Sequence, residues 1–342
     1  MPRNYYIFKS GRVRRKDNTI YIETEEGNKP IPIEDVDSFY LFGELDLNTK
    51  FLNFLSQRNV PAHVFNYYGF YAGSFYPREY LNSGFLLVNQ VEHYIDSRKR
   101  LAIARCISSA ASHNILLNLA YYESRAKEAD EVGAIRSEIE EIASRIGEAK
   151  DVAELMGIEG NIRERYYAAW PAILGSEVDF EKRVRRPPDN LINALISFGN
   201  SMMYASVLSE IYHTQLNPTI SYLHEPGERR FSLALDLAEI FKPLIVDRLI
   251  FALINTRQIK PEHADKQLNY CYLKEEARKL FVAAYEEKLQ TTIRHRRLKR
   301  SVSYRHLIRL ECYRLIKHLT NVEPYEPFKA WCDLYPSPWR LC

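Results

Sequence analysis

The chain changes character after two runs, Ala62-His63-Val64-Phe65-Asn66 and Tyr68-Gly69-Phe70-Tyr71. Both runs are rich in the aromatic and β-branched residues that favour strands. Beyond about residue 87 the apolar residues recur instead with the period of a helix. This change predicts an α+β fold, in which a small β-rich domain over residues 1–85 precedes a large all-helical domain over residues 86–342.

Upstream of the change, further runs look like short strands bounded by Gly, Asn, Asp or Pro: Tyr5–Phe8, Thr19–Thr24, Lys29–Ile33 and Ser38–Phe42. A short helix near residues 48–58 interrupts them, with Asn48 as its cap. Strand edges and many aromatic side chains are therefore expected at the surface of this half, and a partner commonly covers such a surface. We predict a two-fold homodimer built largely through residues 1–85.

Downstream of the change, helical periodicity covers most of the chain, at roughly 89–127, 130–155, 160–171, 188–213, 232–256, 262–289 and 303–319. Glycine and proline predict breaks between these stretches at Gly157, Arg186-Pro187-Pro188, Asn217-Pro218, Pro226-Gly227 and Pro261. Together the stretches predict a helical domain of about 250 residues.

The overall composition says less about the function than the distribution of charged residues along the chain does. With 342 residues, 46% of them hydrophobic, the chain can build a substantial core. The net charge is +3, but residues 294–317 hold nine Lys or Arg and one acid, Glu311. This local excess of positive charge indicates nucleic-acid binding.

Cysteine usage and the N-terminus indicate a soluble, cytoplasmic protein. The five cysteines are widely spaced and include no Cys-x-x-Cys, which argues against a disulfide framework and a cysteine-type zinc site. The N-terminal residues lack the apolar core of a signal peptide. No window reaches about 18 apolar residues, so no membrane span is predicted.

Three separated segments carry the residues best suited to chemistry: Gly157-Ile158-Glu159-Gly160-Asn161-Ile162-Arg163, Tyr222-Leu223-His224-Glu225 and Leu235-Asp236-Leu237-Ala238-Glu239. A glutamate, a histidine and an acidic pair suit Mn²⁺ or Mg²⁺, which favour oxygen ligands with an imidazole over thiolates. Asp236 and Glu239 are three apart in a helical stretch, so they share a face. We predict one metal site aimed at phosphate, with Glu159, His224, Asp236 and Glu239 as its candidate residues.

Each candidate also has an ordinary structural explanation. Glu159 suits the start of a helix, or an ion pair with Arg163 or Arg165. His224 is one of nine histidines, most of which must be structural or on the surface, although its loop is rich in polar residues. The acidic pair lies in an otherwise apolar helix, where ion pairs would also satisfy it, with partners among Arg229, Arg230 and Lys242.

Basic residues predict contacts to a DNA backbone, because arginine forks match phosphate oxygens. The candidates are Arg163, Arg185, Arg186, Arg294, Arg296, Arg297, Lys299 and Arg300. The alternatives are a loop at residues 183–189 that only caps a helix and a solvated face at residues 294–300. Four aromatic residues are candidates for stacking on bases, with core packing as the alternative: Tyr166, Tyr167, Trp170 and Tyr204.

The order and spacing of these motifs resemble the CRISPR adaptation integrases, the Cas-one family of CRISPR-associated endonucleases. The resemblance covers essentially the whole chain. It rests on Gly157-x-Glu159-Gly160-x-x-Arg163, on residues 185–199, on Leu223-His224-Glu225 and on residues 232–243, which read Ser-Leu-Ala-Leu-Asp-Leu-Ala-Glu-Ile-Phe-Lys-Pro.

The resemblance implies a metal site formed by Glu159, His224 and Glu239, with Asp236 as an additional catalytic acid. Relatives with Asp at the position of Glu239 leave open which of Asp236 and Glu239 binds the ion directly. The resemblance further implies Mn²⁺ or Mg²⁺ as cofactor, a two-fold homodimer, and a small partner protein, Cas-two. The implied activity is cleavage of branched DNA and insertion of short foreign DNA, the protospacer, into the CRISPR repeat array by attack of a 3′-OH.

Two other functions fit the same residues. One is a structure-selective DNA nuclease without integration, because both reactions use the same ligands. The other is a non-catalytic nucleic-acid scaffold, which would keep its function when divalent ions are removed. The chain has no Gly-x-x-x-x-Gly-Lys-Ser/Thr loop, which agrees with a transesterification that needs no nucleotide hydrolysis.

Overall fold

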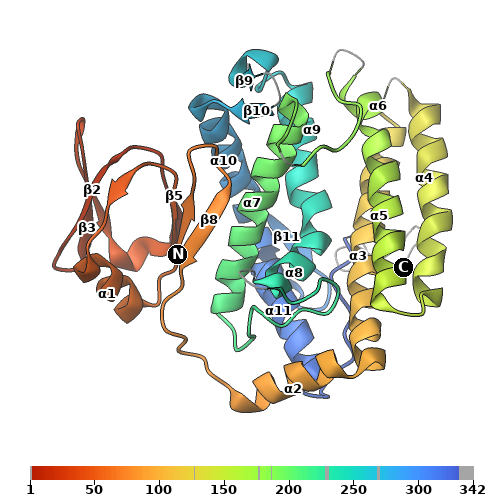
Figure 1. The fold of residues 1–342 in the computed structure, drawn as a ribbon, viewed down its shortest axis with the longest axis horizontal. Coiled ribbons are helices and arrows are strands. Elements are labelled where there is room, and N and C mark those ends of the chain that lie inside the picture. Colours follow the sequence, from red (N-terminus) through yellow and green to blue (C-terminus); the bar gives the residue numbers. More distant parts are fainter. Residues whose placement is uncertain are drawn as a thin grey trace.

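The structure, a computed structural model, describes residues 2–126, 128–175, 178–185, 187–227, 231–267 and 270–330. A strand-rich region on one side adjoins a larger helical region on the other, so the predicted α+β fold class is confirmed (Figure 1). Strand β8 (Tyr71–Phe75) is followed by helix α2 (Gly84–Ile95), which begins the helical region.

Two four-stranded sheets and one helix form the strand-rich region. The first sheet has the order β1-β5-β7-β8, with β1 (Arg3–Ile7), β5 (Val36–Leu41) and β7 (Ala62–Phe65). The second has the order β4-β3-β2-β6, with β2 (Gly11–Lys16), β3 (Thr19–Thr24), β4 (Gly27–Pro32) and β6 (Leu45–Asp46). Helix α1 (Thr49–Arg58) begins at the predicted cap, since Phe51 N donates to Asn48 Oδ1 over 2.9 Å.

The first sheet is covered on both faces, so the strand-rich region is firmly joined to the helical one. One face packs against α1 and the second sheet. On the other face Phe42 stacks on Phe65 and contacts Phe198 of helix α7 (Leu191–Tyr212). Polar contacts reinforce the join, since the hydroxyls of Ser38 and Ser209 lie 2.7 Å apart.

Most aromatic side chains of the strand-rich region are buried or partly buried by contacts within the chain. Tyr5 and Tyr40, two of the aromatic residues in the predicted strands, are buried, whereas Tyr67 and Tyr68 are exposed. The aromatic surface that suggested a dimer interface is therefore smaller than predicted. Dimerisation through residues 1–85 stays a prediction.

The helical region consists of α2, α7 and eight further helices among the described residues: α3 (Ser97–Glu123), α4 (Ala129–Ser144), α5 (Val152–Ala168), α6 (Trp170–Leu174), α8 (Ser232–Lys242), α9 (Arg248–Asn255), α10 (Glu275–Gln290) and α11 (Tyr304–Leu319). Two hairpins that the sequence did not predict interrupt it: β9 (Ala264–Gln267) with β10 (Tyr270–Leu273), and β11 (Thr292–His295) with β12 (Arg300–Ser303). The region is therefore helical except for these two short additions.

Helix α7 packs beside the strand-rich region, as does α10, whose Glu286 accepts a hydrogen bond from Tyr6 over 2.7 Å (Figure 1). Among the described residues α7 alone is long and apolar enough to cross a membrane, but 78% of its most apolar window is buried inside the protein. This burial explains its apolar sequence, because a helix surrounded by other elements needs no polar face.

One predicted break is wrong. Helix α5 continues through Gly157 and Gly160, and it begins earlier, where Glu154 N donates to Asp151 Oδ1 over 2.8 Å. Glu159 therefore lies in the middle of a helix and not at its start. Burial of Leu155, Ile158 and Ile162 stabilises the helix against the cost of its glycines.

Candidate active site

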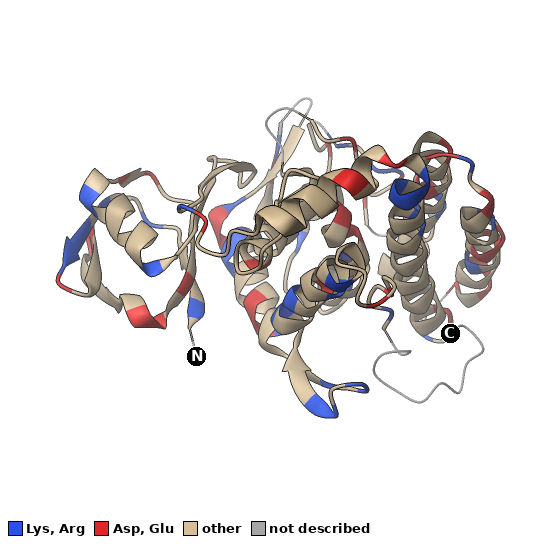
Figure 2. Cartoon of the chain, turned by 90° about the horizontal axis from the view of Figure 1, so that it is seen from below, with Lys and Arg blue, Asp and Glu red and all other residues tan. Residues whose placement is uncertain are grey.

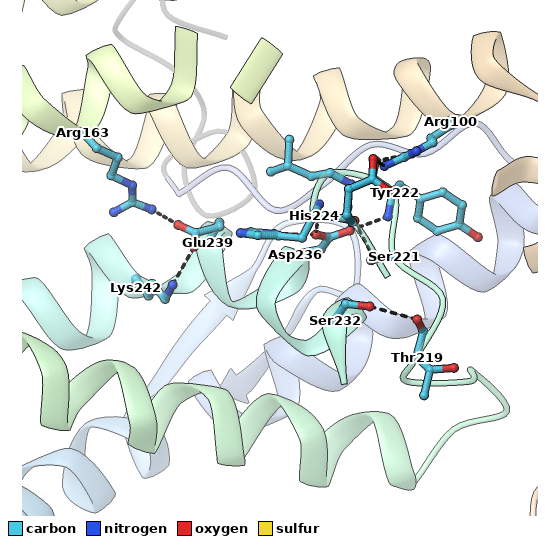
Figure 3. Close-up of polar contacts among 12 residues, drawn as sticks. Arg100, Arg163, Thr219, Ser221, Tyr222, His224, Ser232, Asp236, Glu239 and Lys242 are labelled. Atoms are coloured by element: carbon cyan, nitrogen blue, oxygen red, sulfur yellow. Dashed lines mark hydrogen bonds and ion pairs between the residues drawn. The ribbon is translucent and has the colours of Figure 1, made fainter. Parts of the chain in front are cut away.

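Helix α8 presents Asp236 and Glu239 one turn apart, as their spacing predicts (Figure 3). The start of the helix is tied to the preceding loop, where Ser232 Oγ donates to Thr219 O over 2.9 Å. Its end is set by Pro243, which has no N–H and begins a π-helical turn over Pro243–Asp247.

The irregular end of α8 is held by two asparagines of α3. Asn114 Nδ2 donates to Ile240 O over 2.9 Å, and Asn118 Nδ2 donates to Pro243 O over 2.6 Å. These bonds satisfy carbonyls that a regular helix would pair internally. The position of Glu239 is thereby fixed relative to α3.

Asp236 organises the loop that carries His224. Its carboxylate is fully buried and accepts hydrogen bonds from three successive backbone N–H groups, those of Tyr222, Leu223 and His224, at 2.7, 3.0 and 2.9 Å. It also accepts from His224 Nδ1 at 2.8 Å. Both carboxylate oxygens are therefore occupied by the protein itself.

The bond to Asp236 also sets the chemistry of the imidazole. With the proton on Nδ1 facing the carboxylate, the lone pair of His224 is on Nε2. Figure 3 shows the ring directed towards Glu239. Burial lowers the pKa of His224, but the hydrogen bond and charge of Asp236 outweigh it and raise the pKa above its ordinary value.

Glu239 and Glu159 are joined by the guanidinium of Arg163. Arg163 Nε donates to Glu159 Oε1 over 2.9 Å, and its terminal nitrogen pairs with Glu239. Lys242 Nζ donates to the other oxygen of Glu239 over 2.6 Å. Burial would raise the pKa of Glu239, but the charges of Arg163 and Lys242 outweigh it and hold the pKa well below its usual range.

The structure thus brings Glu159, His224, Asp236 and Glu239 to one place from three segments. Among the described residues no three His, Cys, Asp or Glu side chains stand in metal-ligating geometry. The cause is visible in the contacts: Arg163 stands between the two glutamates, where a shared cation would have to lie. The sequence interpretation that Arg163 or Lys242 pairs with these acids is therefore confirmed, and Arg229 and Arg230 lie outside the described residues.

A divalent cation nevertheless fits the chemistry of this donor set. Two carboxylates and an imidazole lone pair are suitable ligands for Mn²⁺ or Mg²⁺. In the structure two cationic side chains balance Glu159 and Glu239, so the site already stabilises positive charge. An ion bound by both glutamates would replace Arg163 between them.

Asp247 is an acid of this region that the sequence analysis missed. It ends the π-helical turn and is buried, and its Oδ2 has no hydrogen-bond partner among the residues that the structure describes. Burial raises its pKa to about 7, although the charge of Arg163 opposes the shift. An acid at the end of the apolar run Pro-Leu-Ile-Val-Asp was the available signal, because buried carboxylates need a special environment.

The predicted DNA-binding residues divide into buried and exposed ones. Arg163 is 8% exposed, so it offers little surface to a phosphate. Arg185 is exposed, and Arg186 lies outside the described residues. The remaining five are exposed on the hairpin β11–β12, which projects from the helical region with basic residues at its tip (Figure 2): Arg294, Arg296, Arg297, Lys299 and Arg300.

The aromatic residues that were candidates for base stacking are mostly core residues. Tyr166, Tyr167 and Trp170 are buried and contact one another. Tyr204 is half-buried, and its hydroxyl accepts a hydrogen bond from Phe231 N. Core packing, the alternative explanation, is therefore confirmed for the first three.

Fold and site together define a class: proteins with a strand-rich domain, followed by a helical domain that gathers acids, a histidine and basic side chains at one point. The family model of CRISPR associated protein Cas1 matches residues 5–287. The chain is 54% identical to the CRISPR-associated endonuclease Cas1 3 of Thermodesulfovibrio yellowstonii over 96% of this chain and 99% of that protein. The chain belongs to the Cas1 family.

Solved structures agree with this assignment. A CAS1 protein from Thermotoga maritima has a TM-score of 0.85 and 47% identity, with 95% of this chain and 99% of that chain covered. A casposase bound to its integration product shares the fold, with a TM-score of 0.83 at 20% identity over 96% of this chain and 93% of that chain.

Proposed function

We propose that this chain is a metal-dependent DNA endonuclease and integrase of CRISPR adaptation, which joins short DNA to the repeat array by 3′-OH transesterification. The observation that carries the proposal is the meeting of Glu159, His224 and Glu239, with Asp236 holding the histidine. The endonuclease name of the relative that is 54% identical supports nuclease chemistry.

Glu159, Glu239 and Nε2 of His224 would hold Mn²⁺ or Mg²⁺. When bound, the ion polarises the scissile phosphodiester and lowers the pKa of the attacking hydroxyl. Asp236 is assigned to positioning and not to direct ligation, because its two oxygens already accept four hydrogen bonds. Lys242 keeps a positive charge at the site, where a phosphate oxygen would be stabilised.

The proposal includes the surfaces and partners that the reaction needs. The DNA is double-stranded, both as protospacer and as CRISPR repeat, and Arg185, Arg186 and the hairpin residues 294–300 contact its backbone. A two-fold homodimer through residues 1–85 and the small Cas-two protein would set the distance between two active sites. The reaction takes place in the cytoplasm.

A joining assay tests the proposal. The protein and its partner are mixed with a supercoiled repeat plasmid and a protospacer whose 3′ ends are free or blocked. We expect joined products with free ends alone, because the 3′ oxygen is the nucleophile. Equal joining with blocked ends would overturn the transesterification. Nicking without joining would favour the plain nuclease, and DNA binding that survives without any metal-dependent cleavage would favour the scaffold.

A further inference from the structure

Asp247 is a buried acid to which the proposed function assigns no role. It is the last residue of the π-helical turn Pro243–Asp247 and is 2% exposed. Within the ranges that the structure describes, no group donates a hydrogen bond to its buried Oδ2. A buried carboxylate oxygen is costly unless a donor satisfies it, so this atom calls for a partner that the observed arrangement does not supply.

The carboxyl group of Asp247 lies beside the helix face that carries Arg163. Burial raises the pKa of Asp247 to about 7, while the charge of Arg163 and the hydroxyl of Tyr166 lower it. Tyr166 is three residues after Arg163 on α5, so the two share a face. Asn118 Nδ2 donates to Tyr166 Oη over 3.1 Å and to Pro243 O over 2.6 Å. This face of α5 and the turn that ends in Asp247 are thus held together.

Arg163 occupies the place that the ion of the proposed function needs. Its guanidinium pairs with both Glu159 and Glu239, and Figure 3 shows it directed at Glu239. The side chain of Arg163 is only 10% exposed, and arginine keeps its charge at any physiological pH. A guanidinium displaced by the ion therefore needs a second acid, because a buried charge without a partner strongly destabilises a protein.

The charges of the site also favour one more carboxylate when an ion is bound. Three acids face two cationic side chains in the observed arrangement, which leaves one negative charge in excess if the histidine is neutral. A divalent ion would turn this into an excess of one positive charge, and like charges that share a buried site repel one another. The carboxylate of Asp247 cancels that excess.

We propose that Asp247 is the second partner of Arg163, a positioning residue that receives the guanidinium when a divalent ion enters between the two glutamates. The side chain of Arg163 turns on its long stem, so that a terminal nitrogen donates to Asp247 Oδ2. Every buried charge then has a partner both with the ion and without it. The inference rests on the proposed function, because it needs an ion at Glu159 and Glu239.

A double-mutant cycle in Mn²⁺ binding tests the proposal. Isothermal titration calorimetry with Mn²⁺ is carried out on the full chain, on Asp247→Asn, on Arg163→Gln and on the double variant. Asp247→Asn should weaken Mn²⁺ binding by about 10-fold, the scale on which groups outside the ligand set act on a metal site. In the Arg163→Gln background the same substitution should change the affinity by no more than about twofold, because no guanidinium then needs a partner.

Glu210→Gln is the matched control for these titrations. Glu210 is also buried, and its pKa is also raised to about 7 by burial, but it pairs with Arg309. Its substitution should leave Mn²⁺ binding unchanged. Equal losses on Asp247→Asn in the two backgrounds would mean that Asp247 acts on the ion itself. No loss in either would mean that the displaced Arg163 is satisfied elsewhere. Each of these results would overturn the proposal.

A crystal structure of the unsubstituted chain with Mn²⁺ keeps the proposal testable if a variant does not fold. We expect a terminal nitrogen of Arg163 within hydrogen-bond distance of Asp247 Oδ2. A guanidinium that stays between the glutamates, or that turns to solvent, would overturn the exchange. If the unsubstituted chain binds no Mn²⁺, the metal site of the proposed function falls together with this inference. Mn²⁺ binding that is insensitive to Asp247 would remove the inference alone.

Discussion

The acidic cluster between α5 and α8 and the basic hairpin β11–β12 both concentrate charge, but they balance it differently. In the cluster, Arg163 and Glu239 are each 8% exposed, and every charge has a partner within hydrogen-bond reach. On the hairpin, the pair of Arg297 and Glu326 has side chains 62% and 65% exposed. The stability of the fold depends strongly on the partners of buried charges. Each exposed ion pair contributes little to stability, and salt screens it.

The largest effect is expected at the proposed metal ligands. Glu239→Gln or His224→Ala should lower metal-dependent DNA cleavage by roughly 10³-fold, because several kcal/mol of charge stabilisation are lost. Cleavage of branched DNA in Mn²⁺ measures it, with circular dichroism to check the fold. Glu225→Gln is the matched control, since this neighbour is 71% exposed and pairs with Arg100. Full activity of His224→Ala would show that the site is elsewhere.

Two arginines of α5 test the contrast between buried and exposed charge directly. Arg163→Gln should destabilise the metal-free protein by about 3 kcal/mol, because it leaves Glu159 without its partner and the buried Glu239 with Lys242 alone. Arg165→Gln should cost less than about 1 kcal/mol, because its pair with Glu138 is nearly half exposed.

Urea unfolding with a chelator and with Mn²⁺ measures both variants. Mn²⁺ should restore more stability to Arg163→Gln than to the wild type, since the ion replaces the missing guanidinium. Similar losses for the two arginines, or no extra rescue by Mn²⁺, would contradict the view that Arg163 occupies the place of the ion.

A buried acid outside the site should make stability depend on pH. Burial raises the pKa of Glu210 to about 7, although Arg309, which donates to it over 2.6 Å, opposes the shift. The folded protein therefore binds this proton more tightly than the unfolded chain. Stability from this group is complete below the unfolded pKa and is lost as the pH rises through about 7.

Glu210→Gln should remove this dependence, which amounts to at most about 3 kcal/mol between pH 4.5 and pH 8. Urea unfolding of the wild type and the variant at several pH values measures the difference. An unchanged pH profile would mean that Glu210 is ionised in the folded protein throughout this range.

The smallest of these effects is expected at Asp236. Asp236→Asn should weaken Mn²⁺ binding by roughly 10–100-fold, as is typical when the group that orients a ligating histidine is removed. Isothermal titration calorimetry with Mn²⁺ measures the affinity without relying on activity. A complete loss of binding, equal to that of Glu239→Gln, would instead identify Asp236 as a direct ligand.

Sequence patterns within a few neighbouring residues predicted the elements that those same residues specify. Strands β1, β3, β4, β5 and β7, the cap of α1 and the shared face of Asp236 and Glu239 all follow from spacing over a few residues. Strand β2 was missed because Val13 is the one large apolar residue in its sequence Gly-Arg-Val-Arg-Arg-Lys, so the sequence shows no apolar alternation. The hairpin β11–β12 was missed because its strands of four residues are too short to show one.

By itself the sequence determined which residue types meet at the site and which chemistry they suit, because ligand preference depends on the side chains and the motifs keep their order along the chain. Only the tertiary structure decided how they are used. Arg163 became the partner of an acid 76 positions away, and Asp236 became the anchor of a loop 12–14 positions before it. Burial removes water as the alternative partner of a charge, and no pattern within one segment shows which other segment will supply the replacement.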